Sequence, residues 1–207
     1  MKTQKENYEE AHIGVDAVIF TIKDQQLFVY LNTREKDPFI NKAELIGGLL
    51  LPNETAEETL KRKLKELTSA KEIYFQQFYT FTDPKRDPRN RTISIGFIAL
   101  VSPDKIIDTD KFYNLNNLPK LAFDHKEIIM KAFAYLQQNI GNNLIKQFMP
   151  KYFPLNDLQI VHELLSEKKY DNRNFRKKIL DAGIVKKAKE VQKNVSHRPA
   201  TLYQFAD

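Results

Sequence analysis

The sequence contains no cysteine, no long apolar run and no net charge over its first 144 residues. The absence of cysteine excludes disulfides and thiolate metal sites. No apolar stretch approaches the about 20 residues that a membrane-spanning helix needs. The first ten residues, MKTQKENYEE, also lack the apolar segment of a secretory signal peptide. We therefore expect a cytoplasmic protein that has no membrane partner.

The positive charge lies entirely at the C-terminal end. Residues 1–144 carry 20 Lys and Arg against 20 Asp and Glu, whereas residues 145–207 carry 13 against 7. Such a concentration suggests an acidic or nucleic-acid partner for this segment, although on charge alone a solvated lysine-rich surface is the better explanation. A chain of 207 residues, 42% of them hydrophobic, is long enough for one core of about 150 residues and a second, smaller module.

Residues 47–70 read GGLLLPNETAEETLKRKLKELTSA and carry a spaced motif. Their spacing resembles the Nudix box, G-x5-E-x7-R-E-U-x-E-E-x-G-U, where U is apolar. The positions in register are Gly48, Glu54, Arg62, Leu64, Glu66 and Ala70. Three positions depart from it, because Lys63 and Leu67 replace two glutamates and Ser69 replaces a glycine.

The departures bear on catalysis. Ala56, Leu60 and Leu64 recur every four residues and predict a helix from Ala56. The resemblance implies that glutamates on one face of this helix bind Mg²⁺ or Mn²⁺, but here only Glu66 remains, and the ammonium of Lys63 would pair with it and repel a cation. We therefore expect no catalytic residue, no metal and no cofactor, with Gly48, Glu54, Arg62 and Glu66 as remnants of the box.

An enzymatic alternative stays open. The chain could be a Nudix hydrolase of nucleoside diphosphate derivatives that has an accessory C-terminal domain. It would then require Mg²⁺, and a glutamate from outside the box would have to replace the missing carboxylates.

Strands and one further helix are expected around the box. Residues 13–20 and 27–31 read as a strand pair around a polar turn at 22–26, and residues 73–81 and 92–101 as two more strands. Asp124 and Glu127 form a capping-box pattern for a helix whose apolar face comprises Ile128, Ile129, Ala132, Phe133 and Leu136. His125 reads as a surface residue without a chemical role. Gly141, Asn142 and Asn143 mark the end of this helix and of the first domain.

An arginine-rich segment, DPKRDPRNR, separates the last two strands. Its prolines predict a loop, and planar, bidentate guanidinium donors at the mouth of a cleft suit a phosphate or carboxylate. The segment TFTDPKRDPRNR resembles T-F-x-D-P-x-R-D-P-R-x-R of the Nudix-related transcriptional regulators of the NrtR family. That family joins a Nudix-like sensor to a winged helix. The candidate effector-binding residues are Arg34, Arg62, Glu66, Arg86, Arg89 and Arg91.

The resemblance leaves the effector open. ADP-ribose is the effector attributed to the NAD-metabolism branch of the family. Relatives whose box reads R-x-L-x-E-L-T, which Arg62, Leu64, Glu66, Leu67 and Thr68 match, respond instead to sugars. ADP-ribose, a nucleotide sugar and a sugar therefore remain candidates.

The C-terminal segment has the layout of a helix-turn-helix. Residues 155–167 predict a support helix with an Asn cap after Pro154, and residues 172–182 a second helix ended by Gly183. Phe175, Ile179 and Ala182 would form its inner face, opposite Arg173 and Lys177. Two short strands with a basic connection would form a wing. DNRNFRKKI and SHRPATLYQF resemble the family's recognition-helix and wing segments, which implies DNA binding by Arg173, Asn174, Arg176, Lys177, Lys178 and Arg198.

The sequence thus predicts an α/β chain of two domains. Residues 1–143 would form an α+β Nudix fold, a mixed sheet sandwiched by helices, and residues 144–207 a winged helix-turn-helix. The expected function is a ligand-responsive transcriptional regulator, in which the degenerate Nudix domain senses an effector and controls operator DNA binding. We expect a homodimer on a pseudo-palindromic site. The operator sequence and the direction of the response are not specified by the sequence.

Overall fold

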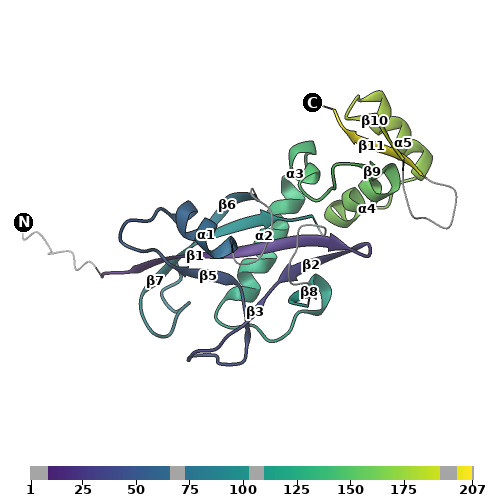
Figure 1. Cartoon of the computed structure of the whole chain (residues 1–207). Helices are drawn as coiled ribbons and strands as arrows, with labels where there is room; N and C mark the ends of the chain where they lie inside the picture. The colour runs from purple at the N-terminus through teal and green to yellow at the C-terminus, as the bar shows by residue number, and fades with distance from the viewer. Residues whose placement is uncertain (1–8, 66–72, 103–109, 192–199, 207) are drawn as a thin grey trace, which may run out of the picture.

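The computed structural model describes residues 9–65, 73–102, 110–191 and 200–206. A large sheet with helices on both faces makes up the N-terminal part, and a smaller group of helices and strands lies beyond one end of it (Figure 1). No helix in these ranges is long and apolar enough to span a membrane.

Strand β1 (His12–Lys23) organises the sheet, whose order is β6-β7-β1-β2-β8 with β5 also paired to β1. On one side β1 runs parallel to β7 (Thr92–Leu100). On the other side its first half pairs antiparallel with β5 (Ile46–Leu49) and its end with β2 (Gln26–Tyr30). Strands β6 (Tyr74–Phe81) and β8 (Phe112–Asn114) form the edges. The predicted mixed sheet is confirmed.

The β1–β2 connection is tighter than expected. Both strands extend into the predicted turn, so that only Asp24 and Gln25 connect them, both at positive φ, 48° and 58°. Two-residue hairpin turns of this kind match the right-handed twist of the strands. Farther along, β3 (Asn32–Thr33) and β4 (Ala43–Glu44) form a small ribbon of their own, and a 3-10 turn, η2 (Leu115–Asn117), follows β8.

Alternate residues of β1 enter two different cores. Val15, Ala17 and Ile19 pack with the buried leucines of α1 (Ala56–Leu64), whereas Val18 and Phe20 pack with the apolar face of α2 (His125–Gln138). Because successive side chains of a strand point to opposite faces, a strand that carries apolar residues on both faces needs a cover on both sides. The predicted arrangement of helices on both faces is therefore confirmed (Figure 1).

Helix α1 begins where its apolar period predicts. Its N-terminus carries a capping box that the sequence analysis missed. Thr55 Oγ1 accepts a hydrogen bond from the Glu58 amide, and Glu58 Oε2 accepts one from the Thr55 amide. The remaining box positions, Glu66, Leu67, Ser69 and Ala70, lie outside the described residues.

Helix α2 corrects two expectations. Its apolar face is as predicted, but Asp124 at the N-cap position makes no capping hydrogen bond with its side chain, so the predicted capping box with Glu127 is wrong. The carboxylate of Asp124 binds Arg86 instead. His125, expected on the surface, is buried with 5% of its area exposed.

The predicted helix-turn-helix and wing are present. Helices α4 (Leu155–Ser166) and α5 (Asn172–Asp181) precede β10 (Val185–Val191) and β11 (Thr201–Phe205), which pair antiparallel. Two short elements were not predicted. Strand β9 (Phe153–Pro154) adds to β11, and α3 (Asn142–Lys146) begins at the residues that were expected to end the first domain.

Two local expectations in this part are wrong. Asn156 does not cap α4, whose N-cap residue is Pro154. The Asn156 side chain instead accepts hydrogen bonds from Asn172 and Arg176 of α5. Ala182 is exposed and does not join Phe175 and Ile179 on the inner face, because α5 ends at Asp181.

The two parts share apolar packing as well as a connecting segment. Leu136 of α2, Ile145 of α3 and Leu158 of α4 are fully buried members of one cluster. The winged part is therefore packed against α2.

Candidate functional site

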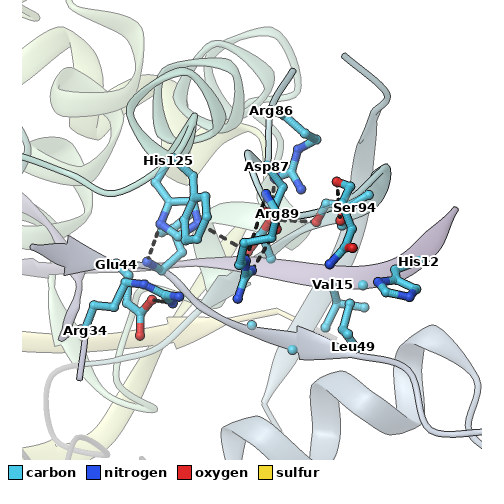
Figure 2. Close-up of a pocket in the computed structure, with 18 residues that line it drawn as sticks. His12, Val15, Arg34, Glu44, Leu49, Arg86, Asp87, Arg89, Ser94 and His125 are labelled. Carbon is cyan, nitrogen blue, oxygen red and sulfur yellow. Dashed lines mark hydrogen bonds and ion pairs between the residues drawn. The ribbon is translucent and has the colours of Figure 1, made fainter. Parts of the chain in front are cut away.

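A cavity of about 330 Å³ opens at the side of the sheet that carries β5. The walls come from strands β1, β5 and β7, from the β3–β4 ribbon and the residue that follows β3, from the loop between β6 and β7, and from the N-terminal end of α2. Figure 2 shows Arg34 and Glu44 at one end, His12 and Leu49 at the other, and side chains of the arginine-rich loop between them. Segments far apart in the sequence thus meet around one space.

A buried ionic network forms the wall on the α2 side. The side chain of Arg86 is 6% exposed. It donates from Nε and Nη2 to the two carboxylate oxygens of Asp124, both at 2.8 Å, and from Nη2 to Asp16 Oδ2 at 2.9 Å. Ser94 Oγ donates to the same Asp16 oxygen at 2.6 Å. This arginine therefore fixes the loop to β1 and to the start of α2.

The ionic partners determine the protonation of Arg86. Burial alone would lower the pKa of its guanidinium, but the hydrogen bonds and negative charges of Asp124 and Asp16 raise that pKa above its ordinary value. Its charge is matched within the protein by two carboxylates. Arg86 thus has a structural role, since its hydrogen bonds go to carboxylates of the protein and not to a ligand.

His125 completes this wall as a neutral side chain. Its Nδ1 accepts a hydrogen bond of 3.0 Å from the Leu45 amide, and its Nε2 lies 3.6 Å from Asp16 Oδ1. An Nδ1 that accepts leaves the proton of the neutral ring on Nε2, where it faces Asp16. Burial lowers the pKa of His125 below 6.5, although the negative charge of Asp16 opposes the shift.

Two further arginines flank an aromatic ring in the cavity. The guanidinium carbons of Arg34 and Arg89 lie 4.7 Å and 5.2 Å from the centre of the Phe123 ring. Arg34 also pairs with Glu44 at 2.8 Å, and Arg89 with Asp87 at 2.7 Å. Arg34 in addition donates to the carbonyl oxygens of Pro38 and Asp37. Because a guanidinium has five N–H donors, each arginine still keeps donors for a ligand. This arrangement suits a ligand that carries an anionic group.

The remaining predicted effector residues lie elsewhere or are not described. Arg62 does not line the cavity. It binds Glu54 through Nε at 2.7 Å and Nη2 at 2.6 Å, and these bonds lower the pKa of Glu54 to about 2. Arg91 donates to the Thr82 carbonyl at 2.8 Å and does not line it either. Glu66 lies outside the described residues.

The box residues that are described do not fit a divalent cation. Glu54 is already bound by Arg62 and by the hydroxyl of Thr59. The side chain of Lys63 lies over Gly48, so that a Cβ added to this glycine would be 2.9 Å from Lys63 Cε. Within the described ranges, no group of three His, Asp or Glu side chains is arranged to hold a metal. A lysine ammonium occupies the place where a carboxylate ligand would be needed.

Sequence reasoning missed several residues of the site. Asp16, Asp87, Phe123 and His125 all line the cavity, and none was a candidate. For Asp16 a signal existed, since it is the single charged residue in the apolar run IGVDAVIF. A charge in the middle of a buried strand indicates a paired or functional group.

The second candidate site is the outer face of α5. Its buried side chains are Phe175 and Ile179. The Asp171 side chain caps the helix by accepting from the Asn174 amide at 2.9 Å. All the candidates on this helix are exposed, namely Arg173, Asn174, Arg176, Lys177 and Lys178. Arg198 lies outside the described residues, whereas Lys187 and Lys189 of β10 add exposed positive charge that was not predicted.

Two family models match the chain. The NUDIX domain matches residues 10–132, and the NrtR DNA-binding winged helix domain matches residues 145–205. The winged helix expected from the recognition-helix and wing motifs is thereby confirmed.

Similar proteins agree with this division. Shewanella oneidensis NrtR in complex with a 27mer DNA shares 30% identity with the chain, at a TM-score of 0.81 over 94% of this chain and 93% of that one. The NUDIX domain of the same protein has been solved with ADP ribose, with 31% identity and a TM-score of 0.52 over 65% of this chain and 94% of that one.

Two further relatives are similar by sequence. The ADPR responsive transcriptional repressor NtrR of Acinetobacter baylyi is 28% identical over 214 residues, covering 98% of this chain and 85% of the relative. The ADP-ribose pyrophosphatase of Methanocaldococcus jannaschii is 37% identical over 127 residues, 59% of this chain and 73% of the relative. With a NUDIX domain followed by an NrtR-type winged helix, and with similarity to an NrtR structure over nearly its whole length, the chain belongs to the NrtR family of Nudix-related transcriptional regulators.

Proposed function

We propose that this chain is an ADP-ribose-responsive transcriptional regulator, with a sensor in residues 1–143 and a DNA-binding domain in residues 144–207. The observation that carries the proposal is the combination, in one chain, of a cavity flanked by two arginines and a helix with an exposed basic face. The first can bind an anionic effector, and the second can bind DNA.

ADP-ribose is favoured over a sugar. Arg34 and Arg89 keep guanidinium donors for the two charges of a diphosphate, and both guanidinium groups are held against the Phe123 ring. A neutral sugar would accept hydrogen bonds from the same donors, but these bonds would lack the strength that a charged acceptor gives them. The names of the Acinetobacter and Methanocaldococcus relatives and the Shewanella NUDIX complex also refer to ADP-ribose.

The sensor binds the effector without hydrolysing it. Support comes from Lys63, which occupies a carboxylate position of the box, and from Glu54, which is bound by Arg62 and Thr59. The identity with an ADP-ribose pyrophosphatase keeps hydrolysis as the second candidate function. The two are separated by assaying the purified chain on ADP-ribose with Mg²⁺ and with Mn²⁺. We expect no turnover, and a rate above about 1 per second, ordinary for an enzyme, would establish the hydrolase.

The winged helix binds an operator through α5 and the wing. Arg173 and Lys177 point away from the buried face of α5, where they can reach base edges or phosphates of a major groove. A homodimer would present two such helices to the two halves of a pseudo-palindromic site.

A mobility-shift experiment tests the regulator as a whole. The probe is the DNA upstream of the chain's own gene, used at about 0.15 M salt with excess nonspecific competitor. We expect a specific complex whose affinity changes on addition of ADP-ribose and stays unchanged with pentoses or hexoses. A complex that responds to a sugar instead would assign a different effector, and binding lost to competitor would refute specific recognition.

A further inference from the structure

Lys63 is a half-buried cation with an unusual position. It lies in the last turn of α1, and its side chain extends over strand β5. Its Nζ lies 3.7 Å from the position that a Cβ on Gly48 would have. Within the described ranges it makes no hydrogen bond or ion pair. Its neighbours differ, because Arg62 binds Glu54 and Arg34 binds Glu44. A half-exposed ammonium in this position is open to an anion that enters the cleft.

The surroundings of Lys63 form a continuation of the effector cavity. Lys63 lines a second hollow of about 690 Å³, which shares Arg34, Glu44, Leu45 and Gly47 with the first. The two hollows therefore adjoin as parts of one cleft. Lys36 and Lys111 also line the second part. Its carboxylates are Glu35 and Glu44, and Glu44 is already paired with Arg34, so Glu35 alone remains to balance the two ammonium groups of Lys36 and Lys63.

Gly48 gives Lys63 its place. A side chain at position 48 would meet Lys63 Cε at 2.9 Å, and this is the flexible end of a lysine. Gly48 also lines the first hollow. The ammonium thus lies beside the backbone that separates the two parts of the cleft, within reach of a ligand that occupies both.

A diphosphate ester carries two negative charges, and its binding in a partly dry cleft requires compensating positive charge. That charge can come from a divalent cation or from the protein. We propose, on the basis of the effector assignment above, that the Lys63 ammonium takes the part of the divalent cation and binds the diphosphate of the effector directly. Binding of ADP-ribose to this chain is then independent of metal.

Calorimetric titration of the full chain with ADP-ribose tests this inference. We expect the same Kd, within about twofold, in EDTA and in Mg²⁺. Lys63→Gln keeps the length of the side chain and removes its charge, and should weaken binding about tenfold to a hundredfold, the range for one charge-assisted contact. Lys65→Gln is the matched control, since Lys65 is exposed on the same helix end and lines neither hollow. Its Kd should be unchanged.

A second variant tests whether the position of the Lys63 ammonium matters, while its charge is kept. Gly48→Ala retains the lysine but displaces its end, and we expect weaker binding with an unchanged melting temperature. Wild-type binding that requires Mg²⁺, or an unaltered Kd in Lys63→Gln, would overturn the inference while leaving the effector assignment intact.

The two proposals can fail separately. If ADP-ribose does not bind in either buffer, the effector assignment is wrong, and inorganic pyrophosphate then decides on the anion site. A pyrophosphate-induced rise in melting temperature that disappears in Lys63→Gln would support the role of Lys63. No rise, or one that survives the substitution, would refute it.

Discussion

The environment of Arg86 illustrates how residue pairing decides the role of an arginine. Its guanidinium makes three hydrogen bonds to two carboxylates in a site that solvent barely reaches. Removing such a group from water is costly, and the cost is recovered only when both partners stay paired. Asp16 and Asp124 therefore depend on Arg86 as much as it depends on them.

We predict that Arg86→Ala lowers the free energy of unfolding by about 3–5 kcal/mol, because it leaves two largely buried carboxylates without their cation. Urea denaturation measures the loss. Arg89→Ala serves as the control, since the side chain of Arg89 is 48% exposed and its pair with Asp87 should contribute less than about 1 kcal/mol. Equal losses in the two variants would contradict this account.

A second prediction concerns the pair of Arg62 and Glu54. Hydrogen bonds from Arg62 hold the pKa of Glu54 at about 2, below its ordinary 4.5. A depressed carboxyl pKa stabilises the fold above 4.5, and the contribution disappears as the pH falls from 4.5 to about 2. In Arg62→Ala we expect this pKa to return toward 4.5, as followed by NMR titration of the Glu54 carboxyl. Lys61→Ala should leave it near 2, and a Glu54 pKa that stays low without Arg62 would assign the shift to another group.

The pairing of individual residues is the part of the site that could not be predicted from the sequence. The guanidinium chemistry of Arg34, Arg86 and Arg89 was predictable, because arginine has the same donors in every context. Which arginine would be paired with carboxylates of the protein itself was not predictable, since Arg86 binds Asp16, which is 70 residues away in the sequence. His125 illustrates the same point, as its burial depends on the Leu45 amide 80 residues away.

At the scale of elements, apolar periodicity predicted the positions of the helices correctly, whereas capping patterns did not predict their caps. Helices α1, α2, α4 and α5 appear where one face repeats every three to four residues, because that face must be buried. The same S/T/D-x-x-E pattern occurs before α1 and α2, yet only Thr55 caps its helix. A cap is a weak local interaction, and at α2 the charge of Arg86 competes for the carboxylate of Asp124.

The exposed face of α5 supports a prediction for the whole helix. Arg173→Ala combined with Lys177→Ala should weaken operator binding at least about thirtyfold, since base and phosphate contacts contribute about 1–3 kcal/mol each. The melting temperature should be unchanged, because neither side chain is buried. The control is Lys120→Ala with Lys126→Ala, which removes two exposed charges from the sensor. Mobility shifts compare the two, and equal losses would indicate a general charge effect in place of recognition by α5.

For the whole molecule, α2 is an element that touches both functional parts. At its start, Asp124 and His125 belong to the wall of the cavity through the Arg86 network. Toward its end, Leu136 lies in the same buried cluster as Ile145 and Leu158 of the winged part. A ligand that shifts the arginine loop can therefore act on the position of the DNA-binding helices through one rigid helix.

This arrangement predicts reciprocal coupling. Linkage requires that ADP-ribose change the DNA affinity by the same factor by which DNA changes the ADP-ribose affinity, and a factor of about 5–150 is usual. Fluorescence anisotropy on labelled operator, with and without ADP-ribose, measures the change in DNA affinity, and calorimetry on the DNA complex measures the change in ADP-ribose affinity.

If α2 carries the coupling, Asp124→Asn should retain both affinities but bring the factor toward one, because its amide cannot hold the Arg86 guanidinium as a carboxylate does. Glu127→Gln, on the exposed side of the same turn, should leave the factor unchanged. A coupling factor that survives Asp124→Asn would place the connection outside α2.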